Sequence, residues 1–175
     1  MAIDTSLDFI SINIAVLTIS DTRTSETDTS GALLKERINS TGHKCVKKLI
    51  IPDNVEKIKQ TLKDLSNEKE IDCIITTGGT GLTGRDTTPE AVMKIADKTI
   101  EGFGELFRQV SFSKIGTSAI QSRALAALIN TTYVFCLPGS KGACKDGWDV
   151  ILQYQLDARH RPCNFVEIMP RLSEK

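Results

Sequence analysis

The sequence lacks an excess of charge of either sign. Its 175 residues carry 22 lysines and arginines against 22 aspartates and glutamates, so the formal net charge at pH 7 is +0. Proteins that bind nucleic acid or an anionic membrane present a basic surface field, and this balance argues against both partners. Any site for a phosphate group must therefore be a local feature.

Side chains that form disulfides or bind transition metals are also scarce. The chain has two histidines, and its five cysteines lie far apart with no C-x-x-C pair. This pattern fits neither a disulfide framework nor the spacing of zinc ligands, which argues against a tightly bound transition metal. Cys73 and Cys136 lie inside apolar runs, where a small buried hydrophobic side chain is favoured over a nucleophile.

The first nine residues contain Asp4 and Asp8 and no basic region that leads into an apolar run. Such a start does not resemble a signal or transit peptide, so we expect a cytoplasmic location. Hydrophobic residues make up 40% of the chain and charged residues 25%, as in ordinary globular proteins. A chain of this length predicts one domain that spans residues 1–175.

The first half of the chain alternates between strand-like and helix-like segments. Three apolar runs rich in β-branched residues cover residues 12–19, 46–51 and 71–76, and amphipathic stretches cover residues 29–40 and 54–65 between them. Strands joined by helices run parallel, and continuously apolar strands are covered on both faces. The pattern predicts an α/β fold, a three-layer α/β/α sandwich with a mainly parallel sheet. We expect four side chains to be buried in it: Ile14, Val16, Ile74 and Ile75.

Residue types that favour helix ends mark the limits of the predicted helices in the first half of the chain and the start of one helix in the second half. Gly42 is expected to close the first helix and Asn54 to open the second. Thr88 is expected to be the N-cap of a further helix, because Pro89 and Glu90 favour the first turn.

The remaining elements are predicted from shorter patterns. Residues 102–112 indicate another helix. Residues 123–129 suit either a helix or the first strand of a hairpin with residues 132–137, and we favour the hairpin. Ser140 is expected to cap a last helix that ends near residue 158, and residues 159–175 to be irregular or an edge strand.

A glycine-rich segment follows the third predicted strand and precedes the helix at Thr88. Backbone N–H groups of such a loop can approach phosphate oxygens at the carboxyl edge of a parallel sheet, so a phosphate cradle is favoured over a mobile turn. The segment lacks the Gly-Lys-Ser/Thr ending of a Walker A loop and the spacing of a dinucleotide-binding fingerprint. Its residues that we predict to bind ligand are Thr77, Gly78, Gly79, Thr80 and Gly81.

Two aspartates belong to the same predicted edge. Asp86 lies at the far end of the glycine-rich segment, and Asp53 follows the second predicted strand. Each suits either a helix cap or a ligand of Mg²⁺, because magnesium at phosphate sites uses one or two carboxylates together with phosphate oxygens. Spacing alone leaves both alternatives open.

Two further loops are expected at this edge. Ser20 and Asp21 end the first strand, and the turn Pro138-Gly139-Ser140 ends the apolar strand 132–137 before a helix. The second turn brings a hydroxyl group and a helix start to a place where an anion could bind, although Pro-Gly is also an ordinary turn signal.

These segments, taken in order, resemble the MoaB/MogA family of molybdenum cofactor biosynthesis proteins over nearly the whole chain. The residues that carry the resemblance are 77–81, 85–90, 101–105, 122–124 and 137–140, and residues 156–165 resemble the MoaB branch. The resemblance implies a three-layer α/β/α fold, homotrimers or homohexamers, and contact with other proteins of the cofactor pathway.

The resemblance also implies a reaction and its participants. Molybdopterin and ATP would be the substrates, Mg²⁺ would assist, and adenylyl-molybdopterin and pyrophosphate would be the products. The two acidic residues that are essential in the family fall on Asp53 and Asp86, as catalytic residues and Mg²⁺ ligands. Positioning and charge neutralisation suffice for such a transfer, so no covalent nucleophile is expected.

Alternatives remain for the function and for several residues. The chain could instead be a non-catalytic protein that binds or delivers molybdopterin. Ser118, Arg123 and Ser140 are weaker candidates for contacts to the anionic substrate, and Arg123 fits a surface or interface ion pair equally well. Residues 101–104 suit packing between subunits or beneath the glycine-rich loop.

Overall fold

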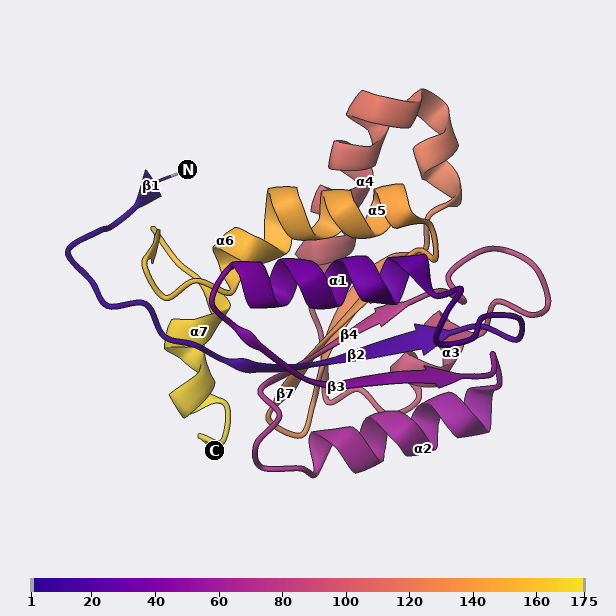
Figure 1. Ribbon diagram of the computed structural model, residues 1–175, viewed down its shortest axis with the longest axis horizontal. Coiled ribbons are helices and arrows are strands. Elements are labelled where there is room, and N and C mark those ends of the chain that lie inside the picture. Colours follow the sequence, from indigo (N-terminus) through magenta and orange to yellow (C-terminus); the bar gives the residue numbers. More distant parts are fainter. Residues whose placement is uncertain (1, 175) are drawn as a thin grey trace.

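A computed structural model describes residues 2–174 and shows a sheet between two layers of helices (Figure 1). The six strands lie in the order β3-β2-β4-β7-β6-β5. Their bounds are β2 Asn13–Ile19, β3 Lys44–Ile51, β4 Cys73–Thr77, β5 Lys98–Thr99, β6 Leu125–Ile129 and β7 Thr132–Leu137. Strands β3, β2, β4 and β7 are parallel, and β6 and β5 are antiparallel additions at one side.

Helices cover both faces of the sheet. On one face lie α1 (Thr29–Ser40), α4 (Glu101–Ile115) and α5 (Lys141–Asp146), and on the other lie α2 (Val55–Ser66) and α3 (Thr88–Met93). Successive strand residues point to opposite faces, so Val16 and Ile75 pack in the first core and Leu17 and Ile74 in the second. The predicted three-layer sandwich is therefore confirmed.

The predicted core is confirmed as well. Ile14, Val16, Ile74 and Ile75 are fully buried, in keeping with strands that have helices above and below them. Strand β3 differs, because it forms the edge of the sheet and is only partly covered, as Val46 shows by its exposure. Its apolar residues alone did not distinguish an edge strand from a central one.

Several local predictions agree with the structure. Helix α1 has the predicted bounds, and Gly42 follows its C-cap with a φ of 93°. Asn54 caps α2 by accepting a hydrogen bond from the Lys57 N–H at 3.1 Å. The ambiguous segment before residue 130 forms the hairpin β6–β7, and Asn130 turns it with a φ of 54°.

Other local predictions were wrong in detail. The N-cap of α3 is Thr87, and Thr88 is instead a buried helical residue whose hydroxyl donates to the Gly78 carbonyl at 3.0 Å. Helix α4 runs three residues past the predicted end at Phe112 and continues into the 3-10 helix η1 (Gly116–Gln121). The predicted helix that Ser140 caps ends at Gln155 and contains the π-helical segment η2 (Gly147–Leu152) before α6 (Gln153–Gln155).

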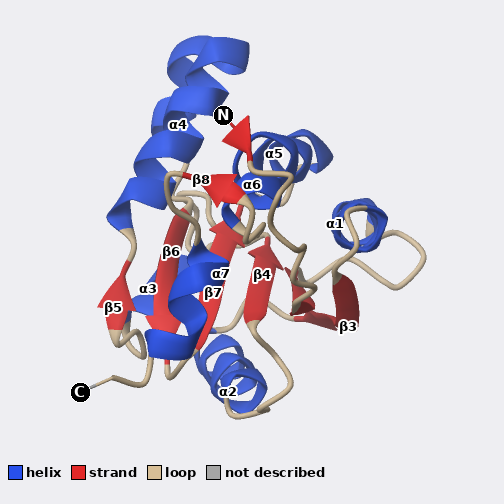
Figure 2. Ribbon diagram, turned by 90° about the vertical axis from the view of Figure 1, so that its left-hand side faces the viewer, coloured by secondary structure: helices blue, strands red, loops and turns tan. Residues whose placement is uncertain are grey.

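The first described residues lie beside the segment that follows α6, as the neighbouring β1 (Ala2–Ile3) and β8 (His160–Arg161) in Figure 2 show. Strand β1 pairs antiparallel with β8 in a second, two-stranded sheet. The tail that was predicted to be irregular or an edge strand also forms the helices α7 (Phe165–Ile168) and η3 (Met169–Arg171). Residues 1 and 175, which end the predicted terminal segments, lie outside the described residues.

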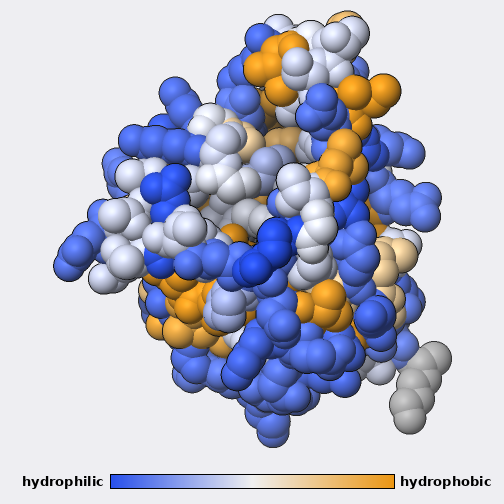
Figure 3. All heavy atoms as spheres, turned by 90° about the vertical axis from the view of Figure 1, so that its right-hand side faces the viewer, coloured by the Kyte–Doolittle hydropathy of each residue, from blue (hydrophilic) through white to orange (hydrophobic). Residues whose placement is uncertain are grey.

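The carboxyl ends of β2, β3, β4 and β7 meet at one edge of the sheet, where the arrowheads of β2 and β3 point in Figure 1. Four loops leave this edge, at residues 20–28, 52–54, 78–87 and 138–140. Figure 3 looks onto this side and shows a hollowed surface of mixed polarity. No helix within residues 2–174 is both long and apolar enough to span a bilayer.

Candidate functional site

The glycine-rich loop begins with two glycines that no other residue could replace without strain. Gly78 and Gly79 have φ values of 105° and 64°, a region that side chains with a Cβ atom rarely adopt. A Cβ atom on Gly78 would lie 2.2 Å from the carbonyl oxygen of Ile19 at the end of β2. The chain therefore turns sharply out of β4 and stays in contact with the neighbouring strand.

A second tight turn packs against the first. Gly139 follows β7, and a Cβ atom there would lie 3.3 Å from the α-carbon of Gly78. The Thr77 hydroxyl donates to the Pro138 carbonyl at 3.1 Å and lies 3.0 Å from the Cys144 sulfur. Burial raises the pKa of the Cys144 thiol to about 11, so this sulfur stays protonated at neutral pH. Thr77 thus connects the end of β4 to the turn that follows β7.

Asp53 reaches the loop from the end of β3. Its Oδ1 atom accepts hydrogen bonds from the Thr87 N–H at 3.0 Å and the Thr87 hydroxyl at 2.6 Å. Its Oδ2 atom lies only 2.5 Å from the position that a Cβ atom on Gly79 would occupy. Asn54 caps α2, so the Asp53 carboxylate is directed to the loop and not to its own helix.

Asp86 lies at the other end of the loop and closes a turn with Thr83. Its Oδ2 atom accepts from the Thr83 N–H at 2.9 Å and from the Thr83 hydroxyl at 2.6 Å. The side-chain hydrogen bond from Thr83 lowers the pKa of this carboxyl, although burial acts in the opposite direction. The ionised carboxylate lies against the α-carbon of Gly81, where a Cβ atom would be 2.7 Å from Oδ2.

The two aspartates touch the same loop but line different cavities. Asp86 belongs to a cavity of about 420 Å³ between the loop and α4, named here the α4 cavity. Asp53 belongs to a cavity of about 620 Å³ beside the start of α2, named here the α2 cavity. The expected convergence of both carboxylates on this edge is confirmed, while the loop itself separates them.

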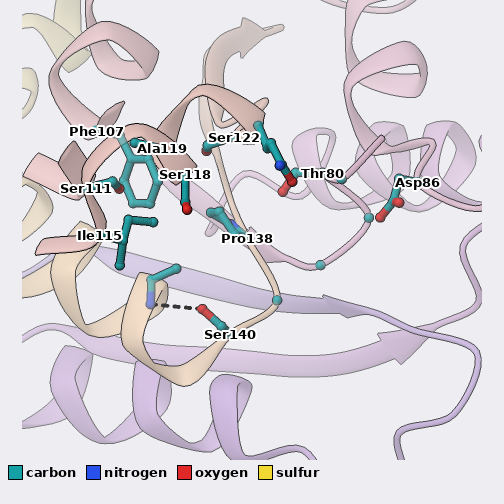
Figure 4. Close-up of a pocket in the computed structure, with 16 residues that line it drawn as sticks. Thr80, Asp86, Phe107, Ser111, Ile115, Ser118, Ala119, Ser122, Pro138 and Ser140 are labelled. Carbon is teal, nitrogen blue, oxygen red and sulfur yellow. Dashed lines mark hydrogen bonds between the residues drawn. The ribbon is translucent and has the colours of Figure 1, made fainter. Parts of the chain in front are cut away.

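The α4 cavity has an apolar end and a polar end (Figure 4). Phe107, Ile115 and Ala119 form the apolar end, and Asp86 lies at the opposite end beyond Thr80. Hydroxyl groups of Ser111, Ser118, Ser122 and Ser140 are distributed along the lining. Among the described residues that line this cavity, Asp86 alone carries a charge. Such a surface suits a flat, uncharged ring with polar edges.

The α2 cavity, unlike the α4 cavity, is lined by several charged side chains. Its lining includes the carboxylates of Asp21, Asp53 and Glu56 and the cations of Lys57 and Arg85. Arg85 forms an ion pair with Asp21, whose Oδ1 atom also accepts from the Asp53 N–H at 3.2 Å. Asp21 therefore lies beside Asp53.

The predicted binding residues fall into three groups. Nine of them line the α4 cavity: Gly78, Gly79, Thr80, Gly81, Asp86, Ser118, Pro138, Gly139 and Ser140. Asp21 and Asp53 line the α2 cavity. Ser20 and Thr77 line a small cavity of about 70 Å³ behind Gly78, where the Ser20 hydroxyl oxygen accepts from the N–H groups of Thr22 and Arg23, each at 3.3 Å.

Arg123 is the remaining predicted residue and lines none of these three cavities. Its guanidinium donates to the carbonyl oxygens of Gly81 at 2.7 Å and Asp86 at 2.8 Å, and it pairs with Glu90. The structure thus gives this side chain protein partners in the glycine-rich loop and in α3.

Apart from Ser118, sequence reasoning missed the wall of the α4 cavity that α4 and η1 supply. Phe107, Ser111 and Ile115 come from α4, and Gln121 and Ser122 come from η1 and its end. The helix was predicted to end at Phe112, and a short 3-10 helix has no strong sequence signature. The cluster of hydroxyl and amide side chains at residues 117–122 is the signal that could have directed attention there.

The carboxylates fit Mg²⁺ only as partners of phosphate oxygens. Within residues 2–174 no group of three histidine, cysteine or acidic side chains is arranged to hold a metal ion. Asp53 uses Oδ1 for Thr87 and keeps Oδ2 at the loop surface. One or two carboxylates with phosphate oxygens and water are the usual Mg²⁺ ligands at phosphate sites, and Asp53 and Asp86 meet that requirement chemically.

The fold and the loop define a class of small α/β domains that bind ligand at the carboxyl edge of the sheet. A family model described as "Probable molybdopterin binding domain" matches residues 15–158. The "Molybdenum cofactor biosynthesis protein B" of Escherichia coli (strain K12) is 45% identical over 160 residues, which are 91% of this chain and 94% of that protein.

Solved structures agree with these matches. A crystal structure of a molybdenum cofactor biosynthesis protein B superposes with a TM-score of 0.85 at 39% identity, covering 95% of this chain and 98% of the other. A tungsten cofactor synthesizing protein MoaB from Pyrococcus furiosus gives 0.72 at 33% identity, covering 81% and 91%. The chain belongs to the MoaB/MogA family of molybdenum cofactor biosynthesis proteins.

Proposed function

We propose that this protein binds molybdopterin and adenylates it with Mg²⁺-ATP, releasing pyrophosphate. The observation that supports the proposal most directly is the pair of aspartates packed on the α-carbons of Gly79 and Gly81, which puts carboxylates on both sides of one loop. The family's role in cofactor biosynthesis supplies the substrate class.

The α4 cavity is the proposed place for the pterin ring. Its apolar end, with Phe107 and Ile115, suits the ring faces, and the serine hydroxyls suit the polar ring edges. Because no basic group is among its described lining residues, we expect the phosphates at the polar end of this cavity, against the backbone of the glycine-rich loop. Backbone N–H groups without neighbouring Cβ atoms can approach phosphate oxygens there.

The proposed reaction is a transfer of the adenylyl group. An oxygen of the molybdopterin terminal phosphate attacks the α-phosphorus of ATP, a new P–O–P bond forms, and the bond between the α-phosphorus and the bridging oxygen breaks as pyrophosphate leaves. Bound Mg²⁺ would supply neutralisation of phosphate charge. Asp53 and Asp86 would hold it and orient the phosphates, so that positioning and electrostatics lower the barrier.

The test is to incubate the purified protein with molybdopterin and Mg²⁺-ATP and to quantify both products. We expect adenylyl-molybdopterin and pyrophosphate in equal amounts, and none of either after chelation of Mg²⁺. Molybdopterin binding without either product would favour the non-catalytic binding or delivery protein. Failure to bind molybdopterin at all would contradict both functions.

A further inference from the structure

Arg123 holds both ends of the exposed part of the glycine-rich loop. Its Nε atom donates to the Gly81 carbonyl at 2.7 Å and its Nη2 atom to the Asp86 carbonyl at 2.8 Å. These two acceptors bracket residues 82–85, all of which are exposed. One planar side chain thus fixes the separation of the residues between which the loop leaves and rejoins the domain.

The guanidinium is itself held in place by α3. Its Nη1 atom pairs with the carboxylate of Glu90, and this hydrogen bond lowers the pKa of Glu90, which keeps the carboxyl ionised at neutral pH. The Arg123 side chain is 28% exposed, whereas the Glu90 side chain is 50% exposed. Three separate partners leave this arginine little freedom to turn towards a ligand.

The other contacts of the exposed span are local or exposed. Thr83 and Asp86 bond to each other through the Thr83 N–H to the Asp86 carboxylate at 2.9 Å and the Asp86 N–H to the Thr83 carbonyl at 3.0 Å. Arg85 pairs with Asp21 while 72% of its side chain is exposed, and such a pair stabilises little. The placement of the Thr83–Asp86 turn relative to the α4 cavity therefore depends on Arg123 and, one residue further along the chain, on the bonds of Thr87 to Asp53.

We propose that Arg123 is a positioning residue, which fixes the backbone of Gly81 and Asp86 so that the Asp86 carboxylate faces the α4 cavity. The expected effect on catalysis rests on the proposed adenylation. The anchoring of the loop by Arg123 does not depend on that function. Of the two alternatives left open for Arg123, substrate contact and an ion pair, the proposal takes the ion pair, because Nε, Nη1 and Nη2 each donate to a protein group.

The chain offers a matched control. Arg108 on α4 donates to the Ala124 carbonyl at 3.3 Å and the Ser122 carbonyl at 3.5 Å, on either side of Arg123 in the sequence. Arg108→Gln removes the same charge next to the same segment without touching the loop, so the comparison with Arg123→Gln isolates the loop contacts.

The first measurement is amide hydrogen exchange at Thr83 and Asp86 in the protein without ligand. Loss of the anchor should free the turn, so exchange at both amides should speed up about tenfold or more in Arg123→Gln and remain near wild type in Arg108→Gln. Equal exchange in both variants and the wild type would overturn the proposal, whether or not the protein adenylates molybdopterin.

The second measurement is adenylation kinetics with Mg²⁺-ATP and molybdopterin. For Arg123→Gln we expect kcat to fall by about thirtyfold to a hundredfold with KM for ATP changed less than about threefold, since misplacement of a catalytic group by about 1 Å can have that effect. Added guanidinium should restore part of kcat to Arg123→Ala. An unchanged kcat in Arg123→Gln, beside an active wild type, would overturn the catalytic consequence, whereas an inactive wild type would contradict the proposed function alone.

Discussion

The Asp53 carboxylate occupies the space that a side chain on Gly79 would need. Its Oδ2 atom lies 2.5 Å from the position of a Cβ atom on Gly79, and the Thr88 hydroxyl lies 2.3 Å from the same position. Gly79 also has a φ of 64°, which adds backbone strain to any substitution. The Asp53 carboxylate can therefore lie in this place only because residue 79 is a glycine.

Gly79→Ala should destabilise the protein by about 1–3 kcal/mol and displace the Asp53 carboxylate, because the new methyl group has no space and the backbone is strained. Gly84→Ala is the matched control, since a Cβ atom at Gly84 meets nothing within 4 Å. Chemical denaturation of the two variants compares their free energies of unfolding. Equal stability of both variants would contradict the close packing of Asp53 on Gly79.

His43 should make stability fall as the pH drops from neutral. Burial lowers the pKa of His43 to about 4 from the usual histidine value of 6.5, while Asp157 opposes the shift. The ring is 4% exposed, packs against Phe9, and accepts the Ile12 N–H at its Nδ1 atom. Between pH 6.5 and 4 the unfolded chain binds more protons than the folded one, so the stabilisation is complete above pH 6.5 and is lost towards pH 4.

This linkage amounts to about 2 kcal/mol between pH 8 and pH 5. His43→Asn keeps an acceptor for the Ile12 N–H and removes the titration. Denaturation of both proteins at a series of pH values should show a steeper loss in the wild type over this range. Parallel curves for the two proteins would show that His43 does not carry the effect.

Cysteine reactivity should follow burial. Cys163 is exposed, whereas Cys73, Cys136 and Cys144 are buried. Burial also raises the pKa values of Cys136 to about 12 and Cys144 to about 11, so few thiolates form at pH 8. A thiol reagent should label Cys163 rapidly and the buried cysteines only after unfolding. The fast phase should vanish in Cys163→Ser, and rapid labelling of Cys144 in the folded protein would contradict the structure.

We propose that the protein forms homotrimers or homohexamers, and that α4 and η1 contribute to the contact. Their exposed apolar side chains are Leu106, Phe112, Ile115 and Ile120, and apolar atoms gather at the top of the view in Figure 3, where this region projects. Light scattering should give three or six times the mass of one chain. Ile120→Asp should shift the mass towards the monomer and Ile10→Asp should not; a monomeric wild type at micromolar concentration would contradict the assembly.

Sequence patterns could predict the layers and the edge at which the site lies, because these depend on local periodicity. Asn54 as a cap and the hairpin at Asn130 are local features of this kind. The partners of Asp53 and Arg123 could not be predicted, because Thr87 and Gly81 lie 34 and 42 residues away from them in the sequence. Such contacts depend on how the finished sheet places its loops, and no local propensity encodes them.

The position of the loop between Asp53 and Asp86 could not be predicted from local patterns either. Parallel strands predict that both residues reach one edge, but the two glycines with positive φ set the path of the loop between them. Each carboxylate was open to interpretation as a helix cap, and the structure shows both bonded to threonines of the loop, Thr87 and Thr83.

The most direct test of the proposed function is the rate of adenylyl-molybdopterin formation by Asp86→Asn and Asp53→Asn. Asparagine keeps the size of the side chain and removes the charge that would hold Mg²⁺ and the phosphates. Each variant should lose about a hundredfold in rate, which is roughly 3 kcal/mol of transition-state stabilisation, with a melting temperature near wild type. Asp64→Asn, at an exposed position on α2, is the control and should keep the wild-type rate. Near-wild-type rates in both Asp53→Asn and Asp86→Asn would contradict the account.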